Sequence, residues 1–306
     1  MIASISLDLD NKWSYMKTHG DEGWESFPSY LDIVVPRVLR LLDDLGLTIT
    51  FFVVGQDAGQ PENHKSLRLI ADAGHEIGNH SFNHEPWLHL YSKQQIIEEF
   101  ERSESAIERA TGQKTIGFRG PGFSYSAEVL QVLCDRNYQY DASTFPTFLG
   151  PIARAYYFLH SGLGKKEKDQ RNQLFGNWKA GFQRLRPYRW KFGSRSLVEI
   201  PVTTMPWFKV PIHLSYVMYL ATFSRVVAET YFYQAMNFCW INRVQPSLLL
   251  HPLDFMGCDD EQGLSFFPGM STASARKTEL ARNLLGWMSK KFNCVTMRKH
   301  ASLLAR

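Results

Sequence analysis

The first part of the chain alternates between short runs with the two-residue period of a strand and longer runs with helical spacing. Serine and aspartate alternate with isoleucine and leucine over residues 4–10, which predicts a strand. Leucine and valine recur at helical spacing over residues 30–45, and Gly46 stands where a C-terminal cap is expected. Residues 48–54 are β-branched and aromatic and predict a buried strand. The chain therefore begins as strand, helix and strand.

The same alternation continues towards the C-terminus. Further strands are expected at 76–78, 115–119, 138–142, 197–201, 247–251 and 293–297. Three further helices are expected: one at 62–73, one that begins at a capping box of Ser92 and Gln95, and one at 273–291. Repeated strand–helix–strand order implies a parallel sheet covered by helices. Seven or eight such units favour a barrel over an open sheet, and in a barrel the chemistry gathers at the carboxyl ends of the strands.

Composition supports one large folded unit with an insertion. The 306 residues are 44% hydrophobic and 21% charged, which excludes a disordered or fibrous chain. Residues 151–195 hold 11 basic and two acidic residues interleaved with aromatic ones, a net +9 against +4 for the whole chain. We interpret the chain as a single catalytic domain, residues 1–306, with a basic aromatic insertion at about 145–196.

Charge and hydropathy also limit the partners. A net charge of +4, with its basic excess confined to one segment, argues against a nucleic-acid binder. The chain shows neither a secretion signal nor an apolar run of about 18 residues, so the expected location is the cytoplasm. Segment 151–195 contacts the inner face of a membrane in one interpretation, with the apolar residues 205–242 lying at the same interface. In the alternative interpretation, 151–195 is a solvated basic face and 205–242 contains an ordinary core helix. The oligomeric state stays open.

Two carboxylates and two imidazoles form the first candidate site. Asp8 and Asp10 share one face at the end of the first strand, where like charges are costly unless a cation compensates them. His80 and His84 follow another strand and would face the same way on a helical turn. Two imidazoles and a carboxylate suit Zn²⁺ or a similar divalent ion, although two unrelated loop histidines are the alternative.

Three more residues stand at the ends of expected strands. Arg119 precedes a Gly-Pro-Gly turn whose backbone N–H groups suit an oxyanion. Asp141 ends the next strand, and we expect it to hold Arg119 by a charge-assisted hydrogen bond, unless the two form an ordinary surface pair. His251 follows three leucines; at a barrel mouth it would be the natural general acid, whereas a lone histidine there is usually structural.

Taken together and in this order, SLDLD, HSFNH, FRGPG, Asp141 and LLLHP resemble the polysaccharide deacetylase family, the NodB-homology enzymes of carbohydrate esterase family 4. The resemblance covers about residues 1–145 and 195–260 and implies a distorted (β/α) barrel, often of seven strands. It implies these roles: Asp8 as catalytic base, Asp10, His80 and His84 as metal ligands, Arg119 as the arginine that positions the base, Asp141 as the acid that orients Arg119, His251 as general acid, and the Gly122 N–H as oxyanion donor. The chain departs from the family in having Gly122 in place of a common tyrosine, and Asp-Leu-Asp in place of adjacent acids.

The resemblance implies a metal-dependent hydrolase that removes an N-acyl group, in the first instance acetyl, from an amino sugar in a glycan or glycan precursor. Its metal would be zinc, with cobalt, nickel or manganese as substitutes, and its substrate a carbohydrate or a lipid-linked sugar. One alternative is a deformylase or allantoinase-like amidohydrolase on the same fold, acting on a lipid-linked sugar or a non-sugar amide. Another is a glycan-binding module with a relic site. Release of acetate or of formate distinguishes a deacetylase from a deformylase. Turnover of any substrate excludes a glycan-binding module with a relic site.

Overall fold

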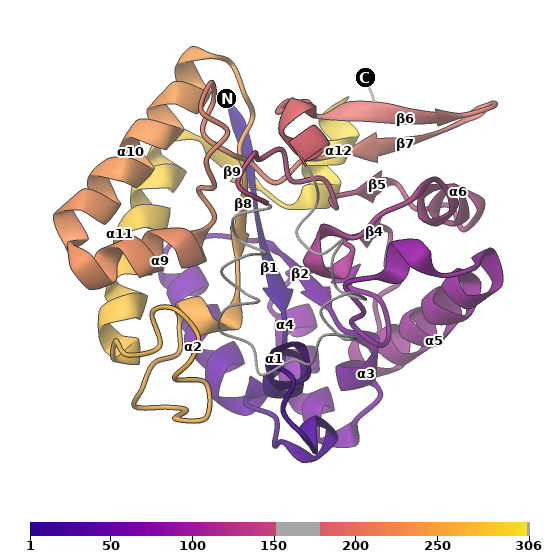
Figure 1. The fold of residues 1–306 in the computed structure, drawn as a ribbon, viewed down its shortest axis with the longest axis horizontal. Helices are drawn as coiled ribbons and strands as arrows, with labels where there is room; N and C mark the ends of the chain where they lie inside the picture. The colour runs from indigo at the N-terminus through magenta and orange to yellow at the C-terminus, as the bar shows by residue number, and fades with distance from the viewer. Residues whose placement is uncertain (151–177, 305–306) are drawn as a thin grey trace.

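A curved sheet forms the centre of the computed structural model, which describes residues 1–150 and 178–304 (Figure 1). Seven strands pair in parallel, in the spatial order β7 (Arg195–Glu199), β5 (Tyr140–Asp141), β4 (Gly117–Phe118), β3 (Glu76–Asn79), β2 (Thr50–Val53), β1 (Ile2–Leu9) and β8 (Ser247–Leu250). The predicted distorted (β/α) barrel of about seven parallel strands is confirmed.

Two further strands and one extended segment complete the sheet. β6 (Tyr188–Phe192) pairs antiparallel with β7, and β9 (Asn293–Val295) pairs with the first residues of β1. The chain that follows β7 connects the two ends of the curved sheet. Val202 N donates to Thr144 O at 2.9 Å, and Thr203 N donates to Ser247 O at 3.0 Å. The barrel is therefore closed by extended chain outside the regular strands.

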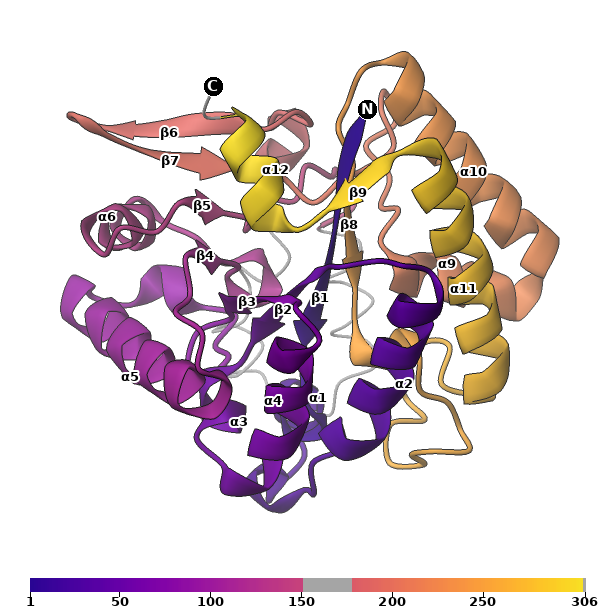
Figure 2. The same ribbon diagram turned by 180° about the vertical axis from the view of Figure 1, so that it is seen from behind.

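Helices cover the outside of this sheet, with α9, α10 and α11 on one side and α5 and α6 on the other (Figures 1 and 2). The α-helices are α1 (Lys12–His19), α2 (Leu31–Asp44), α3 (Gly55–Ala58), α4 (His64–Asp72), α5 (Lys93–Thr111), α6 (Ala127–Asp135), α9 (Leu214–Phe223), α10 (Arg225–Ile241), α11 (Ser274–Lys291) and α12 (Met297–Leu304). Short 3₁₀ turns are η1 (Trp24–Ser26), η2 (Pro61–Asn63), η3 (Leu88–Leu90), η4 (Pro121–Phe123), η5 (Trp178–Phe182) and η6 (Pro252–Asp254). The capping box of Ser92 and Gln95 is confirmed at the start of α5.

The first strand shows how the sequence pattern is used. Ile5 and Leu7 belong to the apolar core, whereas the alternate residues point into the barrel. There Ser4 Oγ lies 2.9 Å from His300 Nδ1, and Ser6 Oγ accepts from Arg119 Nη1 at 2.8 Å. Both faces are buried, so the polar face of this strand meets protein side chains and not solvent.

The two regions expected to approach a membrane differ in how far the structure describes them. Residues 151–177, most of the basic insertion, lie outside the described residues, and the end that is described forms η5 and β6. The apolar region 205–242 forms α9 and α10. Among the described residues, no helix has both the length and the apolar character needed to cross a membrane.

Candidate metal centre

Two strands on either side of β2 bring the three expected metal ligands together. Asp10 directly follows β1, and His80 directly follows β3, one strand removed in the sheet. Asp10 Oδ1 lies 3.0 Å from His84 Nε2 and 3.5 Å from His80 Nε2. All three residues are buried, and one ligand atom from each lies within 4.8 Å of the others. This triad offers one oxygen and two nitrogens to a metal ion.

The hydrogen bonds around the triad leave its ligand atoms free. His80 Nδ1 lies 2.6 Å from the Arg119 carbonyl oxygen, which can only accept, so Nδ1 carries the proton and the lone pair is on Nε2. Asp10 Oδ1 is buried and accepts no hydrogen bond within the described part of the chain. Burial works to raise the pKa of Asp10, but His84 and His80 beside it bring the pKa well below its ordinary value. The carboxylate is thus ionised, and the donor set fits a divalent cation.

The loop that carries the two histidines is not the helical turn expected from their spacing. Residues 80–84 are irregular, with positive φ at Ser81 (62°) and His84 (51°). Glu99 of α5 holds the loop, because its Oε2 accepts from Phe82 N at 2.9 Å and from Asn83 N at 3.0 Å. The histidines face one ion site because a distant carboxylate fixes the backbone, and not because of helical periodicity.

Asp8 lies between this triad and a buried arginine. Arg119 is fully buried, and its Nη1 donates to Asp8 Oδ1 at 2.8 Å. Its guanidinium lies over the Phe52 ring, 4.6 Å from the centroid, and its Nε donates to the Ala142 carbonyl at 3.0 Å. The other oxygen of Asp8 lies 3.9 Å from His80 Nε2. Asp8 is therefore held in a fixed orientation by Arg119, next to the triad, as a base beside a bound metal ion would have to be.

Asp141 does not hold Arg119, which corrects the sequence prediction. Both residues lie in the described part of the chain, and no hydrogen bond or ion pair joins them. The sheet register explains this, since Asp141 pairs with Phe118 of β4. Side chains alternate between faces along a strand, so Asp141 shares the face of Phe118 and Arg119 points to the other.

Asp141 instead supports the turn that follows Arg119. Ser143 Oγ donates to Asp141 Oδ1 at 2.6 Å and accepts from Gly120 N at 2.8 Å. Glu199, opposite Asp141 in β7, bonds to Thr144 and Trp190 and hydrogen-bonds to Asp141. Burial and the Asp141 charge raise the pKa of Glu199, which lets this pair of carboxyl groups share a proton. Strand patterns alone did not single out Glu199.

The turn itself explains the glycine that departs from the family pattern. Gly122 is exposed and has a φ of +57°, in the region that favours glycine. A Cβ there would lie 3.0 Å from Pro86 Cβ, so a larger residue would have to displace Pro86. No hydrogen bond links Gly122 to the triad among the described residues, and its role as oxyanion donor stays a prediction.

His251 reaches the same mouth from the other side of β1. Leu250 pairs with Leu7, which places His251 alongside Asp8. His251 Nδ1 lies 3.0 Å from Ser215 Oγ at the start of α9. A second imidazole, His213, has its ring centroid 5.7 Å from that of His251. The sequence pattern missed Ser215 and His213, and the general-acid role of His251 stays a prediction.

Helix α1 places Trp13 next to His84, and η1 places Trp24 next to Trp13. Trp13 is 6% exposed and meets His84 edge-on, with ring centroids 6.2 Å apart. Its Nε1 donates at 2.9 Å to Asp57, whose pKa burial raises to about 7. Trp24 lies 5.5 Å from Trp13 and is partly exposed. Trp13 thus packs as a buried residue against a ligand, which leaves Trp24 as the more accessible ring.

Comparison with known proteins supports the family resemblance. Residues 21–140 match the polysaccharide deacetylase family. The peptidoglycan-N-acetylmuramic acid deacetylase of Bacillus subtilis is 35% identical over 133 residues, which cover 43% of this chain and 46% of the relative. The peptidoglycan deacetylase of Helicobacter pylori is 28% identical over 150 residues, covering 47% and 49%. The chain spans about half the length of the curated relatives it matches.

A solved structure extends the likeness of fold to nearly the whole chain. The crystal structure of a putative polysaccharide deacetylase from Mycobacterium smegmatis covers 98% of this chain and 88% of its own, with a TM-score of 0.65 and 20% identity. The chain has the fold of a polysaccharide deacetylase. As its motifs indicated, it resembles the polysaccharide deacetylase family, that is, the NodB-homology proteins of carbohydrate esterase family 4.

Proposed function

We propose that this protein is a metal-dependent hydrolase that removes an N-acyl group, in the first instance acetyl, from an amino sugar of a glycan or glycan precursor. The observation that carries the proposal is the buried Asp10–His80–His84 triad with the arginine-held Asp8 at its side. The names of the two curated relatives described above support the substrate class, since both are peptidoglycan deacetylases.

The proposed metal is zinc, with cobalt, nickel or manganese as substitutes. Asp10, His80 and His84 would hold it. When bound, such an ion polarises the acyl oxygen and acidifies a water molecule. Its site would be kept in shape by Arg119, whose carbonyl fixes the His80 ring, and by Glu99, which fixes the histidine loop.

The chain's own residues would move the protons. Asp8 accepts a proton from the attacking water, and Arg119 keeps that carboxylate oriented. The Gly122 N–H donates to the acyl oxygen as negative charge develops there. His251 protonates the nitrogen as the carbon–nitrogen bond breaks, because an amide nitrogen leaves poorly as an anion. The water oxygen ends on the carboxylic acid product and the nitrogen leaves as a free amine.

Release of acetate from short N-acetylated sugar oligomers tests this proposal. The wild-type protein loaded with zinc is expected to release acetate. Asp10→Ala is expected to lose the metal and the activity, and His251→Ala to keep the metal and lose turnover. Asp72→Ala, at an exposed aspartate on α4, is the matched control. Full activity in Asp10→Ala would refute the assignment, and formate release from a formylated substrate alone would favour the deformylase.

A further inference from the structure

Helix α10 exposes large apolar side chains at both of its ends. Phe223, just before the helix, is 74% exposed, and Val226 and Ile241 are 73% and 66% exposed. Other exposed apolar side chains on this face and the neighbouring loop are Val227, Trp240, Trp207 and Phe208. We call these seven residues the α10 face. They gather at the two ends of the helix, and the exposed residues between the two groups include the uncharged Thr230 and Gln234.

The α10 face is unusual because the opposite side of the same helix is also apolar. Phe232, Ala235, Met236 and Cys239 are fully buried in the core. A surface helix normally carries charges on its outer side. Between Val226 and Ile241 the only charged residue is Glu229, and it is bound to Arg225 at 2.9 Å. An exposed apolar surface of this kind marks a contact site.

Basic residues border the C-terminal end of the α10 face. At the C-terminal end of the helix, the exposed Arg186 donates to the Asn242 carbonyl at 2.7 Å, and Arg243 is exposed. Lys291 Nζ lies 5.6 Å from the centre of the Trp240 ring, and Lys290 beside it is exposed. Arg186 also connects the face to the described end of the basic insertion.

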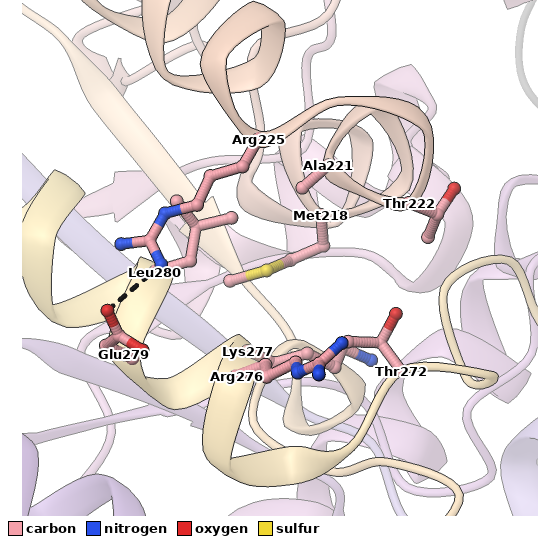
Figure 3. Close-up of a pocket in the computed structure, with 9 residues that line it drawn as sticks. All are labelled: Met218, Ala221, Thr222, Arg225, Thr272, Arg276, Lys277, Glu279 and Leu280. Atoms are coloured by element: carbon pink, nitrogen blue, oxygen red, sulfur yellow. Dashed lines mark hydrogen bonds and ion pairs between the residues drawn. The ribbon is translucent and has the colours of Figure 1, made fainter.

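A pocket of about 380 Å³ lies at the other end of the face, between α9 and α11 (Figure 3). Its lining combines Arg225, Arg276 and Lys277 with Thr222, Thr272, Glu279 and the apolar Met218, Ala221 and Leu280. Glu279 is bound to Arg225 at 3.0 Å. Arg276 is exposed and forms no ion pair with any described residue. Lys277 is buried and its Nζ donates to the Leu253 carbonyl at 2.5 Å, so the cation that this pocket offers is Arg276, beside the hydroxyl groups of Thr222 and Thr272.

We propose that the α10 face docks on an anionic phospholipid bilayer and that the pocket receives a lipid phosphate. Exposed tryptophan and phenylalanine side chains, framed by lysine and arginine, are the side chains that an anionic membrane interface accommodates. A second copy of the chain fits less well, because the two basic rims would face each other. The proposal does not depend on hydrolysis.

The test is flotation of the full chain with phosphatidylcholine vesicles, with and without phosphatidylglycerol. We expect binding to the anionic vesicles that weakens at high salt. Phe223→Ser and Val226→Asp are each expected to lower the partition coefficient about tenfold, at the lower end of what burying such a side chain contributes. Leu69→Asp is the control, since Leu69 is 40% exposed on α4, away from this face.

The charged part has its own variant. Arg276→Gln is expected to weaken binding to the anionic vesicles and to leave any residual binding to pure phosphatidylcholine unchanged. Absence of flotation would overturn the proposal, and so would equal binding by Val226→Asp. Concentration-dependent dimerisation that Val226→Asp abolishes would identify a second copy as the occupant instead. Acetate release from a soluble substrate should stay unchanged in Val226→Asp, so this test fails separately from that of the proposed hydrolase.

Discussion

The barrel interior holds two polar clusters that differ in how fully their groups are paired. The mouth cluster consists of Asp8, Asp10, His80, His84 and Arg119. The base cluster consists of Ser4, Thr50, Glu76, Tyr140 and His300. Both are buried, so water does not satisfy either of them freely. The cluster that has unpaired buried polar atoms is the better candidate for a binding site.

In the base cluster each carboxylate oxygen and ring nitrogen has a partner. Glu76 Oε1 accepts from Tyr140 OH at 2.9 Å, and its Oε2 accepts from Thr50 Oγ1 at 2.7 Å and from the backbone N of Arg298 at 2.8 Å. His300 lies 2.9 Å from Ser4 Oγ and 3.1 Å from Gln245 Oε1. These bonds fix α12 under the barrel and have a structural purpose.

The mouth cluster keeps buried atoms without hydrogen bonds. These are Asp10 Oδ1, His84 Nδ1 and Arg119 Nη2, counted over the described residues. An unsatisfied buried polar atom costs about 1–3 kcal/mol, so a cluster with three of them is tolerated only for a reason. The reason that we propose is the binding of a metal ion and a substrate. Phe52 separates the clusters, with its ring between Arg119 and Tyr140.

The largest expected effect comes from replacing Asp8, the proposed proton acceptor in the mouth cluster. Asp8→Asn keeps an acceptor for Arg119 but cannot take a proton, so kcat should fall by about 10²–10⁴-fold. Zinc content should stay at the wild-type level, because Asp8 is not in the triad. If kcat were unchanged, the mouth cluster would lose its catalytic interpretation.

Removal of the separating ring should disturb both clusters. Phe52→Ala is expected to lower the free energy of unfolding by about 3–5 kcal/mol, because it empties a fully buried site. Urea denaturation measures this, and Phe52→Leu should cost clearly less. A loss below about 1 kcal/mol would mean that the two clusters do not depend on this ring.

The base cluster predicts a loss of stability in acid. Burial lowers the pKa of His300 from 6.5 to about 4. Between these pH values the His300 ring is protonated in the unfolded chain but neutral in the folded chain. The free energy of unfolding therefore has its full value above about pH 6.5. It decreases by about 3 kcal/mol as the pH falls to 4. His300→Gln should remove this part of the pH dependence in urea denaturation. Identical pH profiles for the two proteins would contradict the assignment.

A smaller effect tests the pairing within the base cluster. Tyr140→Phe removes the donor to Glu76 Oε1 and should lower the free energy of unfolding by about 1–3 kcal/mol. Tyr219→Phe, at a partly exposed tyrosine, is the control and should be neutral. Acetate release should not change in either variant. A fall in kcat in Tyr140→Phe alone would show that the base cluster acts on the site.

The sequence predicted the elements and the grouping of Asp10, His80 and His84 better than the contacts around them. Alternation in residues 4–10 placed Asp8 and Asp10 on one face, because a strand has a fixed period. It could not place Asp141, because the face of Asp141 depends on its register with β4. The histidine spacing pointed to two residues that do lie together with Asp10, but not through the expected helical turn, since Glu99 fixes that loop from α5. Both faces of β1 are buried, but only one side of α10 is. Which faces are buried depends on tertiary packing, which the periodicity of the sequence does not show.

The central claim is that the mouth cluster binds a divalent cation through Asp10, His80 and His84. Equilibrium dialysis of the metal-free protein against zinc tests it most directly. We expect one tightly held zinc ion per chain, lost in Asp10→Ala and in His80→Ala, and retained in Glu76→Gln, a change confined to the base cluster. Wild-type protein that takes up no zinc, or binding that survives both triad substitutions, would contradict the claim.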